Sequence, residues 1–289
     1  MERKAIAALA MTLCFWASAF VAIRVALAGG FGPGHLALFR FLVGSAAMGV
    51  LVAVRGGARL PRWRDMPVAL VHGFLGFFVY HVALNWGERT VSAASACFLV
   101  GSIPVFMAVL AVVLLKERLT PLAWAGMAVS MAGVACIALG EGGGLRIDTG
   151  ALLVLLAALG VSLYYVLIQP YLARYGSLGY TAVTMWLGTA CMLIFTPGLG
   201  QTVSQASAEA VLAVVYLGVC PGALAYAGWN YAISRGNVAR IGATQFLMPG
   251  ITIVIGWAWL GELPSRTALA GGCIALAGVV VVTRSRRNR

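Results

Sequence analysis

The sequence predicts an all-α integral membrane protein with ten transmembrane helices in two inverted five-helix repeats and both termini in the cytoplasm. Three observations support this prediction: an apolar composition, ten apolar runs of helical length, and an internal repeat. The chain has 289 residues, of which 62% are hydrophobic and 10% are charged. Soluble domains carry roughly 25% charged residues, so water is not the main solvent of this chain.

An offset of 145 residues relates the landmarks of the two halves without a gap. The related pairs include Asn85 and Asn230, Pro104 and Pro249, Glu117 and Glu262, and Gly133 and Gly278. Self-similarity at a fixed period indicates a repeated structural unit. We therefore predict a first repeat at residues 1–139, a linker at 140–148 and a second repeat at 149–289.

Ten apolar runs have the length of a membrane span, which is about 20 residues. They cover about 5–27, 34–54, 66–86, 92–115, 121–139, 149–171, 178–195, 209–233, 238–260 and 265–283. Turn signals such as Gly29-Gly30 and the basic stretch 55–64 separate them. The first run is too long for the apolar region of an ordinary signal peptide, so we expect it to remain as the first span.

The basic residues give the orientation. Fifteen of them fall on the side of the N-terminus and four on the other side, and Arg40 lies within the second span. Cytoplasmic loops are enriched in Lys and Arg, so both termini are predicted to be cytoplasmic. Five spans per repeat is an odd number, so the second repeat enters the membrane from the opposite side. Inverted repeats are typical of secondary carriers, which hold substrate near the midplane and alternate access between the two sides.

Other classes of function fit less well. The net charge of +12 is spread over short clusters between apolar runs, without a basic–aromatic face, so we expect no nucleic-acid partner. No metalloprotease, nucleophile-elbow or nucleotide-loop motif is present, so we expect no enzyme activity. A channel or a structural membrane protein would explain the hydrophobicity but not the inverted repeat.

The six cysteines lie inside apolar runs, without a CxxC pair or a histidine at metal-ligand spacing. We therefore expect them to be small buried apolar residues, and we expect no metal and no cofactor.

Small residues recur at helical spacing in the fifth and tenth runs, which permits close approach of helix backbones. They are Gly126, Ser130 and Gly133, and Gly271, Ala275 and Gly278. Because the two runs are equivalent, they could pack together within one chain or form a dimer interface. The protein could accordingly be a monomer or a dimer.

Each half closes with a Pro-containing span, a charged turn and a Gly-rich span that ends in Gly-Val. The turns read Leu-Lys-Glu-Arg-Leu-Thr at 115–120 and Leu-Gly-Glu-Leu-Pro-Ser at 260–265. Together with Phe15–Arg24 and Phe39-Arg-Phe41, this pattern resembles the EamA-type drug/metabolite transporter (DMT) superfamily over essentially the whole chain.

The resemblance implies a bacterial-type inner (plasma) membrane protein that exports amino acids and other small metabolites. It also implies a cavity lined by spans 1, 3, 4, 6, 8 and 9. Among the members we favour the YddG-like aromatic amino acid exporters. A carrier of drugs or of other metabolites, such as nucleotide-sugars, is the alternative within the same superfamily. For nucleotide-sugars, a diphosphate would require several basic residues inside the spans, where only Arg40 is available.

Aromatic and amide residues on these spans are the candidate substrate contacts. They are Trp16, Phe77, Tyr80, His81, Phe98, Tyr164, Tyr165, Tyr226, Trp229, Asn230 and Gln245. Each one alone also fits helix packing. As a set they favour a solute with an aromatic or bulky apolar side chain, since Tyr and Trp combine an apolar body with a polar group.

All eight acidic residues fall in loops or at helix ends. Ion-coupled carriers commonly use an embedded carboxylate, so its absence favours uniport or exchange of neutral or zwitterionic solutes. His81 is the best titratable candidate for coupling, and a neutral histidine bonded to a carbonyl is the alternative.

Proline removes a backbone hydrogen bond and kinks its helix, so Pro104 and Pro249 are candidate gating hinges. Four further polar residues are interpreted as structural: Arg40, Asn85, Glu117 and Glu262. Arg40 could extend to the membrane interface or bind a carboxylate. Asn85 and Asn230 are expected to hydrogen-bond across helices, and Glu117 and Glu262 to cap or position their turns.

Overall fold

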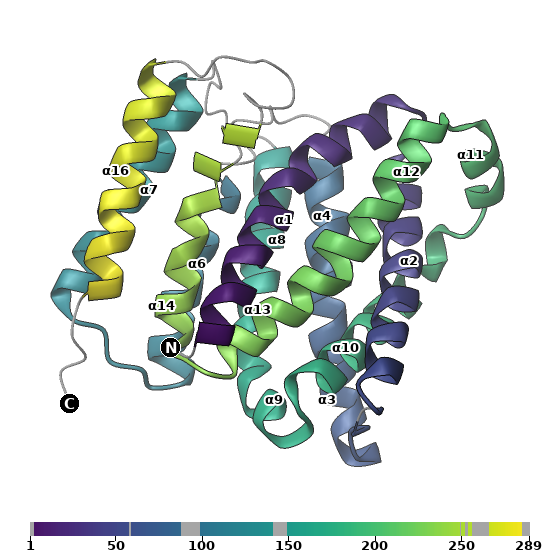
Figure 1. Cartoon of the computed structure of the whole chain (residues 1–289), viewed down its shortest axis with the longest axis horizontal. Coiled ribbons are helices and arrows are strands. Elements are labelled where there is room, and N and C mark those ends of the chain that lie inside the picture. Colours follow the sequence, from purple (N-terminus) through teal and green to yellow (C-terminus); the bar gives the residue numbers. More distant parts are fainter. Residues whose placement is uncertain are drawn as a thin grey trace. The chain divides into compact units, whose positions relative to one another are not determined.

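The computed structural model describes residues 3–57, 59–87, 99–140, 149–248, 250–251, 254–255 and 266–284. All regular structure in these ranges is helical (Figure 1), which confirms the predicted all-α class. Within them, five helices are long and apolar enough to cross a membrane: Pro33–Val54, Trp63–Gly87, Thr149–Leu167, Ser177–Phe195 and Ala208–Ile233. Shorter apolar helices lie at Ile103–Leu114, Pro121–Cys136 and Ala270–Val282. The protein is therefore a multi-pass membrane protein, and the count of ten spans stays a prediction.

The chain divides into two compact units, and each unit combines segments from both halves of the sequence. Unit 1 comprises Met1–Asn85 and Leu167–Arg235, and unit 2 comprises Trp86–Val166 and Gly236–Arg289. Segments that the 145-residue offset relates thus fall mostly within the same unit.

Unit 1 contains two long helices that are interrupted by a π-helical segment. The first consists of α3 (Met66–Gly73), the π segment η2 (Phe74–Val79) and α4 (Tyr80–Gly87). The second consists of α12 (Ala208–Leu217), the π segment η4 (Gly218–Leu224) and α13 (Ala225–Ile233). The other elements of unit 1 are α1 (Arg3–Ala28), α2 (Pro33–Val54), η1 (Trp63–Asp65), α9 (Gln169–Tyr175), α10 (Ser177–Met192), η3 (Leu193–Phe195) and α11 (Leu199–Gln205).

Among the described residues, unit 2 contains the charged turn at residues 115–120 and six helical elements. They are α6 (Ile103–Leu114), α7 (Pro121–Gly140), α8 (Thr149–Leu167), α14 (Val238–Ala243), η5 (Thr244–Leu247) and α16 (Arg266–Arg284). Helix α8 is shorter than the predicted span 149–171. Pro170 lies in the first turn of α9, where its missing N–H costs nothing, and it separates the two helices.

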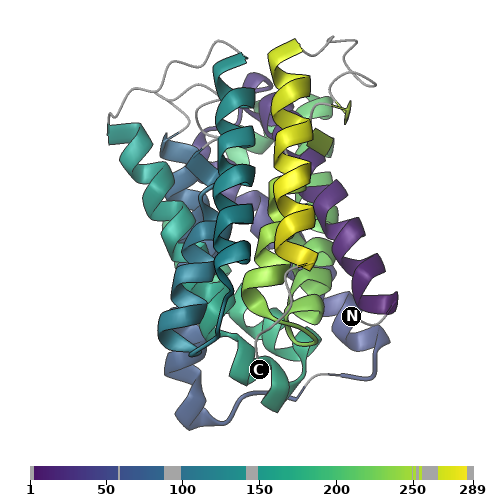
Figure 2. The ribbon, with the colours of Figure 1, turned by 90° about the vertical axis from the view of Figure 1, so that its left-hand side faces the viewer.

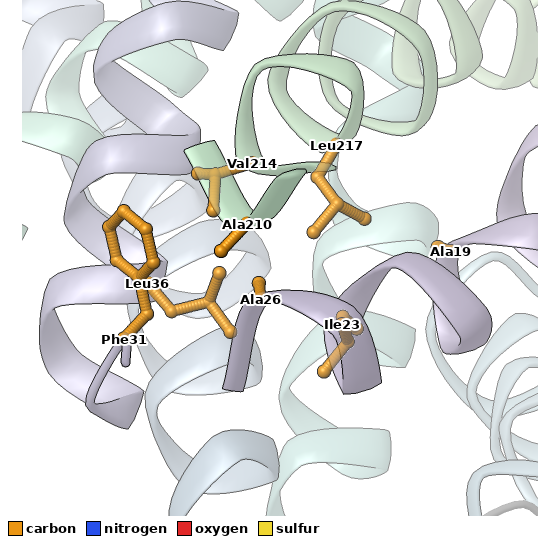
Figure 3. Packing of buried hydrophobic residues seen from close by; sticks show 8 residues of the cluster. All are labelled: Ala19, Ile23, Ala26, Phe31, Leu36, Ala210, Val214 and Leu217. Carbon is orange, nitrogen blue, oxygen red and sulfur yellow. The ribbon is translucent and has the colours of Figure 1, made fainter. Parts of the chain in front are cut away.

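A hydrophobic core in unit 1 joins the end of α1, the following turn, the start of α2 and α12 (Figure 3). Its buried members are Ala19, Ile23, Ala26, Phe31, Leu36, Ala210, Val214 and Leu217. Gly29 makes the approach possible, because a Cβ atom there would collide with the side chains of Ala210 and Ser207. The Gly29 carbonyl also accepts a hydrogen bond from Ser207 N at 3.2 Å.

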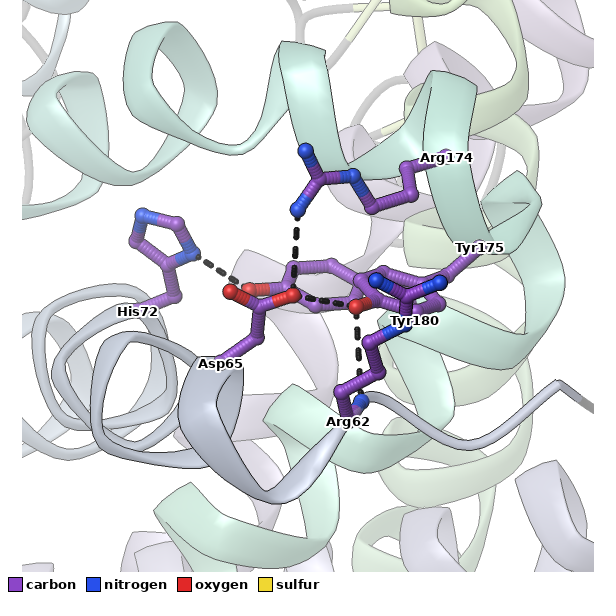
Figure 4. A network of polar contacts seen from close by, with 6 residues as sticks. All are labelled: Arg62, Asp65, His72, Arg174, Tyr175 and Tyr180. Carbon is purple, nitrogen blue, oxygen red and sulfur yellow. Dashed lines mark hydrogen bonds and ion pairs between the residues drawn. The ribbon is translucent and has the colours of Figure 1, made fainter.

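The chain segment before α3 is tied to α9 by polar contacts (Figure 4). Arg174 Nη1 lies 3.1 Å from Asp65 Oδ2, and the Tyr175 hydroxyl donates to the same carboxylate oxygen. The Tyr175 oxygen accepts from Arg62 N at 3.3 Å. Hydrogen bonds with Tyr175 and Asp65 raise the pKa of the Arg174 guanidinium above its ordinary value.

A stack of three tyrosine rings lies next to this network in unit 1. The rings of Tyr171 and Tyr175 both stack on Tyr180, at centroid distances of 5.3 and 5.8 Å. His72 Nδ1 lies 3.0 Å from the Tyr180 hydroxyl in a buried contact. These contacts fix α9 against α3 and α10 although α9 has only seven residues.

Helices α7 and α16 of unit 2 lie side by side along their small-residue faces (Figures 1 and 2). A Cβ atom on Gly278 would lie 2.5 Å from Gly126 O, and one on Gly133 would lie 2.6 Å from Gly271 O. The Ser130 hydroxyl donates to Ala275 O at 3.1 Å. Of the two interpretations of these residues, the structure therefore shows the pair within one chain.

Glycine also allows two related crossings in unit 1. A Cβ atom on Gly73 would collide with the backbone of α10 at Thr184 and Gly188. A Cβ atom on Gly218 would lie 2.6 Å from Arg40 O in α2. Gly73 and Gly218 are related by the 145-residue offset, and each immediately precedes or begins a π segment.

The expectation of buried cysteines is wrong for the described residues. Cys14 and Cys273 are exposed, and Cys136, Cys191 and Cys220 are partly exposed. Large apolar side chains on the helices are exposed too, for example Val50 and Val113. In a membrane protein an apolar side chain can leave the protein interior and still lie in an apolar solvent, so an apolar run does not predict burial within the chain.

The α7–α16 contact predicts opposite effects for two substitutions on one helix. Gly278→Ala is expected to lower the thermal unfolding temperature in detergent, since overpacking typically costs about 1–3 kcal/mol. Gly272→Ala is the matched control, because its Cβ atom would meet nothing within 4 Å. It should leave the temperature unchanged or raise it, since Ala is the better helix former. Equal effects of the two substitutions would contradict the close packing.

Candidate functional site

Six of the predicted site residues form one aromatic cluster in unit 1. They are Trp16, Phe77, Tyr80, His81, Tyr226 and Trp229, from α1, η2, α4 and α13. The Trp16 ring lies 5.6 Å from Tyr226 and 5.1 Å from Trp229, between centroids. Phe77 lies 4.7 Å from Tyr226, and Tyr80 lies 4.7 Å from His81. Trp16 and Tyr80 are partly exposed, and the other four are buried.

His81 and Tyr226 contact each other although they occupy equivalent places in the two halves. His81 Nε2 lies 3.3 Å from the Tyr226 oxygen, at a sequence separation of 145. The Tyr226 hydroxyl donates to Gly76 O at 3.4 Å. Because the hydroxyl has one proton, His81 then donates from Nε2, so this nitrogen carries a hydrogen. Ser130 and Ala275 form the corresponding equivalent pair in unit 2.

The two π segments each offer one backbone carbonyl to an aromatic side chain. Gly76 O in η2 accepts from Tyr226, and Pro221 O in η4 accepts from Trp16 Nε1 at 3.1 Å. Gly76 and Pro221 are related by the 145-residue offset. Single π turns interrupt the regular helical hydrogen-bond ladder and occur frequently at functional sites. The predicted helical stripe thus begins in the π segment at Phe77 and continues in α4 at Tyr80 and His81.

The equivalent asparagines form equivalent contacts in unit 1. Asn85 Nδ2 donates to Pro33 O at 3.0 Å, at the start of α2. Asn230 Nδ2 donates to Thr181 Oγ1 at 2.8 Å, near the start of α10. Both therefore hydrogen-bond across helices, as the sequence suggested.

Arg40 and Phe41 extend the aromatic cluster on its α2 side. Arg40 is 6% exposed, and its guanidinium carbon lies 5.5 Å from the centroid of the Phe41 ring. The Phe41 ring lies 4.5 Å from His81 and 5.4 Å from Phe77. Phe41 is a site residue that the substrate-contact list missed. The sequence could have indicated Phe41, because this residue directly follows the embedded Arg40 in the Phe-Arg-Phe motif.

Three other predicted site residues belong to unit 2. Tyr164 and Tyr165 are buried in α8 and lie 5.3 Å apart between ring centroids. Gln245 in η5 is 8% exposed, and its Nε2 lies 3.9 Å from Met107 Sδ in α6. No sequence pattern indicated Met107 as a partner of Gln245.

Pro104 lies in the first turn of α6, after a turn at Gly101 and Ser102 that breaks the predicted fourth span. Its position fits a bend between two helical pieces better than a kink inside one helix. Phe98, Pro249 and Glu262 lie outside the described residues.

Glu117 links the α6–α7 turn to another helix of unit 2. Its Oε1 accepts from Val238 N at 3.3 Å, at the first residue of α14. Asn237 is the N-cap of the same helix, and its side chain accepts from Arg240 N. Glu117 therefore caps α14 and not only its own turn. A cleft of about 370 Å³ borders this turn, lined by Val112, Glu117, Arg118, Leu119, Thr120, Pro121 and Trp124.

The described residues contain no cluster of three His, Cys, Asp or Glu side chains that could hold a metal ion. Acidic residues in the described ranges, such as Asp65, Glu117 and Glu209, lie at helix ends or in turns. The aromatic cluster offers apolar ring faces, an imidazole and backbone carbonyls. The cluster thus combines apolar surfaces with a few polar groups.

A sequence model of the EamA-like transporter family matches residues 3–139 and again residues 148–284. The chain belongs to this family, within the DMT superfamily. The predicted family is confirmed, and so is the prediction that the chain is a transporter and not an enzyme.

Two relatives are about 40% identical to the chain. The transporter YdfC of Bacillus subtilis is 41% identical over 264 residues, which cover 91% of this chain and 86% of YdfC. A protein of Streptantibioticus cattleyicolor, named "Probable terminal-alkyne amino-acid exporter", is 40% identical over 286 residues, or 99% and 95% of the two chains. The aromatic amino acid exporter YddG of Ancylobacter novellus is 25% identical over 272 residues, or 91% of each chain.

A solved crystal structure supports the fold alone. It superposes with a TM-score of 0.81 at 22% identity and covers 98% of this chain and 97% of its own.

The contact of Glu117 predicts a difference between two substitutions. Glu117→Ala removes the acceptor for Val238 N and should destabilise the protein by about 1 kcal/mol, the usual cost of a lost helix cap. Glu117→Gln keeps an acceptor oxygen and should spare most of that stability. Thermal unfolding in detergent measures both, with the exposed neighbour Arg118→Ala as control. A Gln variant as unstable as the Ala variant would show that charge, and not the capping oxygen, is what stabilises.

Proposed function

We propose that this transporter exports amino acids with aromatic or other apolar side chains. The aromatic cluster of unit 1 carries the proposal, because it places five aromatic rings and an imidazole around polar groups inside apolar helices. Stacking of a substrate ring on such residues contributes about 0.5–1.5 kcal/mol per pair beyond area burial. Within the cluster, Trp16 Nε1 donates to Pro221 O and the Tyr226 hydroxyl donates to Gly76 O.

The names of two relatives agree with this class of substrate. One is named as an exporter of terminal-alkyne amino acids and the other as an exporter of aromatic amino acids. Both kinds of side chain are apolar and carry π electrons. A wall of aromatic rings accommodates either, so we propose the class and not one member of it.

We further propose that the chain forms ten spans in two inverted repeats, at 1–139 and 149–289, joined by 140–148. Both termini would lie in the cytoplasm, and the membrane would be a bacterial-type inner membrane. The two family matches lie close to these bounds. Equivalent residues that contact each other, His81 with Tyr226 and Ser130 with Ala275, support a pseudo-two-fold relation between the repeats. Alternating access of a central site follows from that architecture.

Transport would proceed by uniport or exchange. The acidic residues of the described ranges support this, since they lie at helix ends or in turns and not within the aromatic cluster. Bends at Pro104 and Pro249 would supply the gating movement, and the turn that precedes α6 supports the first of them.

Flux in liposomes tests the substrate and the coupling together. Purified protein should move labelled phenylalanine and a labelled amino acid with a terminal-alkyne side chain, and should move serine poorly. The rate should not change when a proton gradient is imposed, because the cluster holds no carboxylate among the described residues. Protein-free liposomes are the control.

Transport of small polar solutes alone would overturn the proposed substrate class. Flux that stops without the gradient would overturn uniport, and His81→Gln would then identify the coupling residue if it abolished the gradient dependence.

A further inference from the structure

The hydrogen bonds to Gly76 O and Pro221 O lie at equivalent positions of the two repeats, but their donor side chains differ in exposure. Tyr226, which donates to Gly76 O, is 1% exposed. Trp16, which donates to Pro221 O at 3.1 Å, is partly exposed. The donor to Pro221 O is thus the more accessible of the two donors.

Pro221 O is suited to accept a donor from a ligand. It already accepts a hydrogen bond from a side chain of another helix, Trp16 in α1. The indole N–H of Trp16 can only donate, and an ammonium group can also only donate. An ammonium group can therefore replace the indole N–H as the hydrogen-bond donor to Pro221 O.

Aromatic rings around Trp16, the donor to this carbonyl, favour a cation. The rings of Tyr226 and Trp229 lie 5.6 and 5.1 Å from Trp16 between centroids. Ammonium groups are attracted to the faces of Trp and Tyr, and the attraction grows when water is excluded. Non-α-helical backbone carbonyls in the core of carriers also coordinate cations.

We propose that the Pro221 carbonyl, with the rings of Trp16, Tyr226 and Trp229, is the ammonium subsite of the transport site. It takes the primary ammonium group of the substrate in place of the Trp16 N–H. The proposal rests on the proposed function, which it deepens: the substrate is recognised through its amine, so an amine without a carboxylate also binds.

Three ligands that share a phenyl ring test the subsite on the wild-type protein: phenylalanine, 2-phenylethylamine and 3-phenylpropionate. Binding is measured by titration calorimetry on purified protein in detergent. Phenylalanine and 2-phenylethylamine should bind, and 3-phenylpropionate should bind at least about tenfold more weakly, because it has no donor for Pro221 O. Equal binding of phenylalanine and 3-phenylpropionate would overturn the proposal.

Trp16→Phe keeps a ring and removes the competing N–H. It should tighten the binding of both amines about threefold to tenfold, the range of one net hydrogen bond, and leave 3-phenylpropionate unchanged. Trp186→Phe is the matched control. Trp186 is also partly exposed and donates to a backbone carbonyl, Ser45 O at 3.0 Å, but this carbonyl lies in the regular helix α2. The control should change none of the three affinities.

Tightening of all three ligands by Trp16→Phe, or the same change in Trp186→Phe, would show a packing effect and overturn the subsite. If Trp16→Phe does not fold, the comparison of ligands on the wild-type protein decides alone. Amine binding that depends on Trp16 without phenylalanine flux in liposomes would retain the subsite and remove the proposed function. Phenylalanine flux in liposomes, together with equal binding of phenylalanine and 3-phenylpropionate, would retain the proposed function and remove the subsite.

Discussion

Satisfaction of backbone hydrogen bonds without water is the constraint on which this structure depends. In the hydrocarbon core every peptide group needs an internal partner, so spans are helical and departures from the α-helix are costly. The two π segments of unit 1 are such departures, and a side chain from another element bonds the carbonyl of each. Trp16 donates a hydrogen bond to Pro221 O, and Tyr226 donates one to Gly76 O. The aromatic cluster therefore forms hydrogen bonds to the backbone of both interrupted helices as well as forming the candidate site.

Close backbone contact explains how these interrupted helices are held in place. Lipid offers no hydrophobic driving force between helices, so packing depends on small residues that let backbones approach. Gly73 and Gly218 bring the two interrupted helices onto α10 and α2, next to the π segments. The polar contacts of Asn85 and Asn230 fasten the same helices at their other ends. Each π segment thus lies between a glycine crossing and an asparagine hydrogen bond.

The sequence predicted the all-helical class, the family and most helix bounds, because apolar runs and the 145-residue offset are long-range patterns that survive local variation. It predicted six members of the aromatic cluster because they are aromatic or polar residues on the spans that the family resemblance assigns to a cavity. It did not predict the π segments, since Gly76 and Pro221 are different residues and only their shared offset connects them. It misplaced the cysteines because an apolar run does not distinguish a lipid-facing side chain from a buried one. Met107 and the contact of Glu117 with α14 depend on tertiary geometry alone.

The two halves agree where they pack and differ where the candidate site lies. Glycines recur at the helix crossings, and the asparagines recur at the helix ends. Equivalent positions in the cluster diverge instead: histidine at 81 meets tyrosine at 226, and glycine at 76 corresponds to proline at 221. A symmetric site would bind both ends of a solute alike. Divergence within a repeated frame gives the two halves different chemistry at the candidate site, as the proposed solute with one apolar end and one amine end would require.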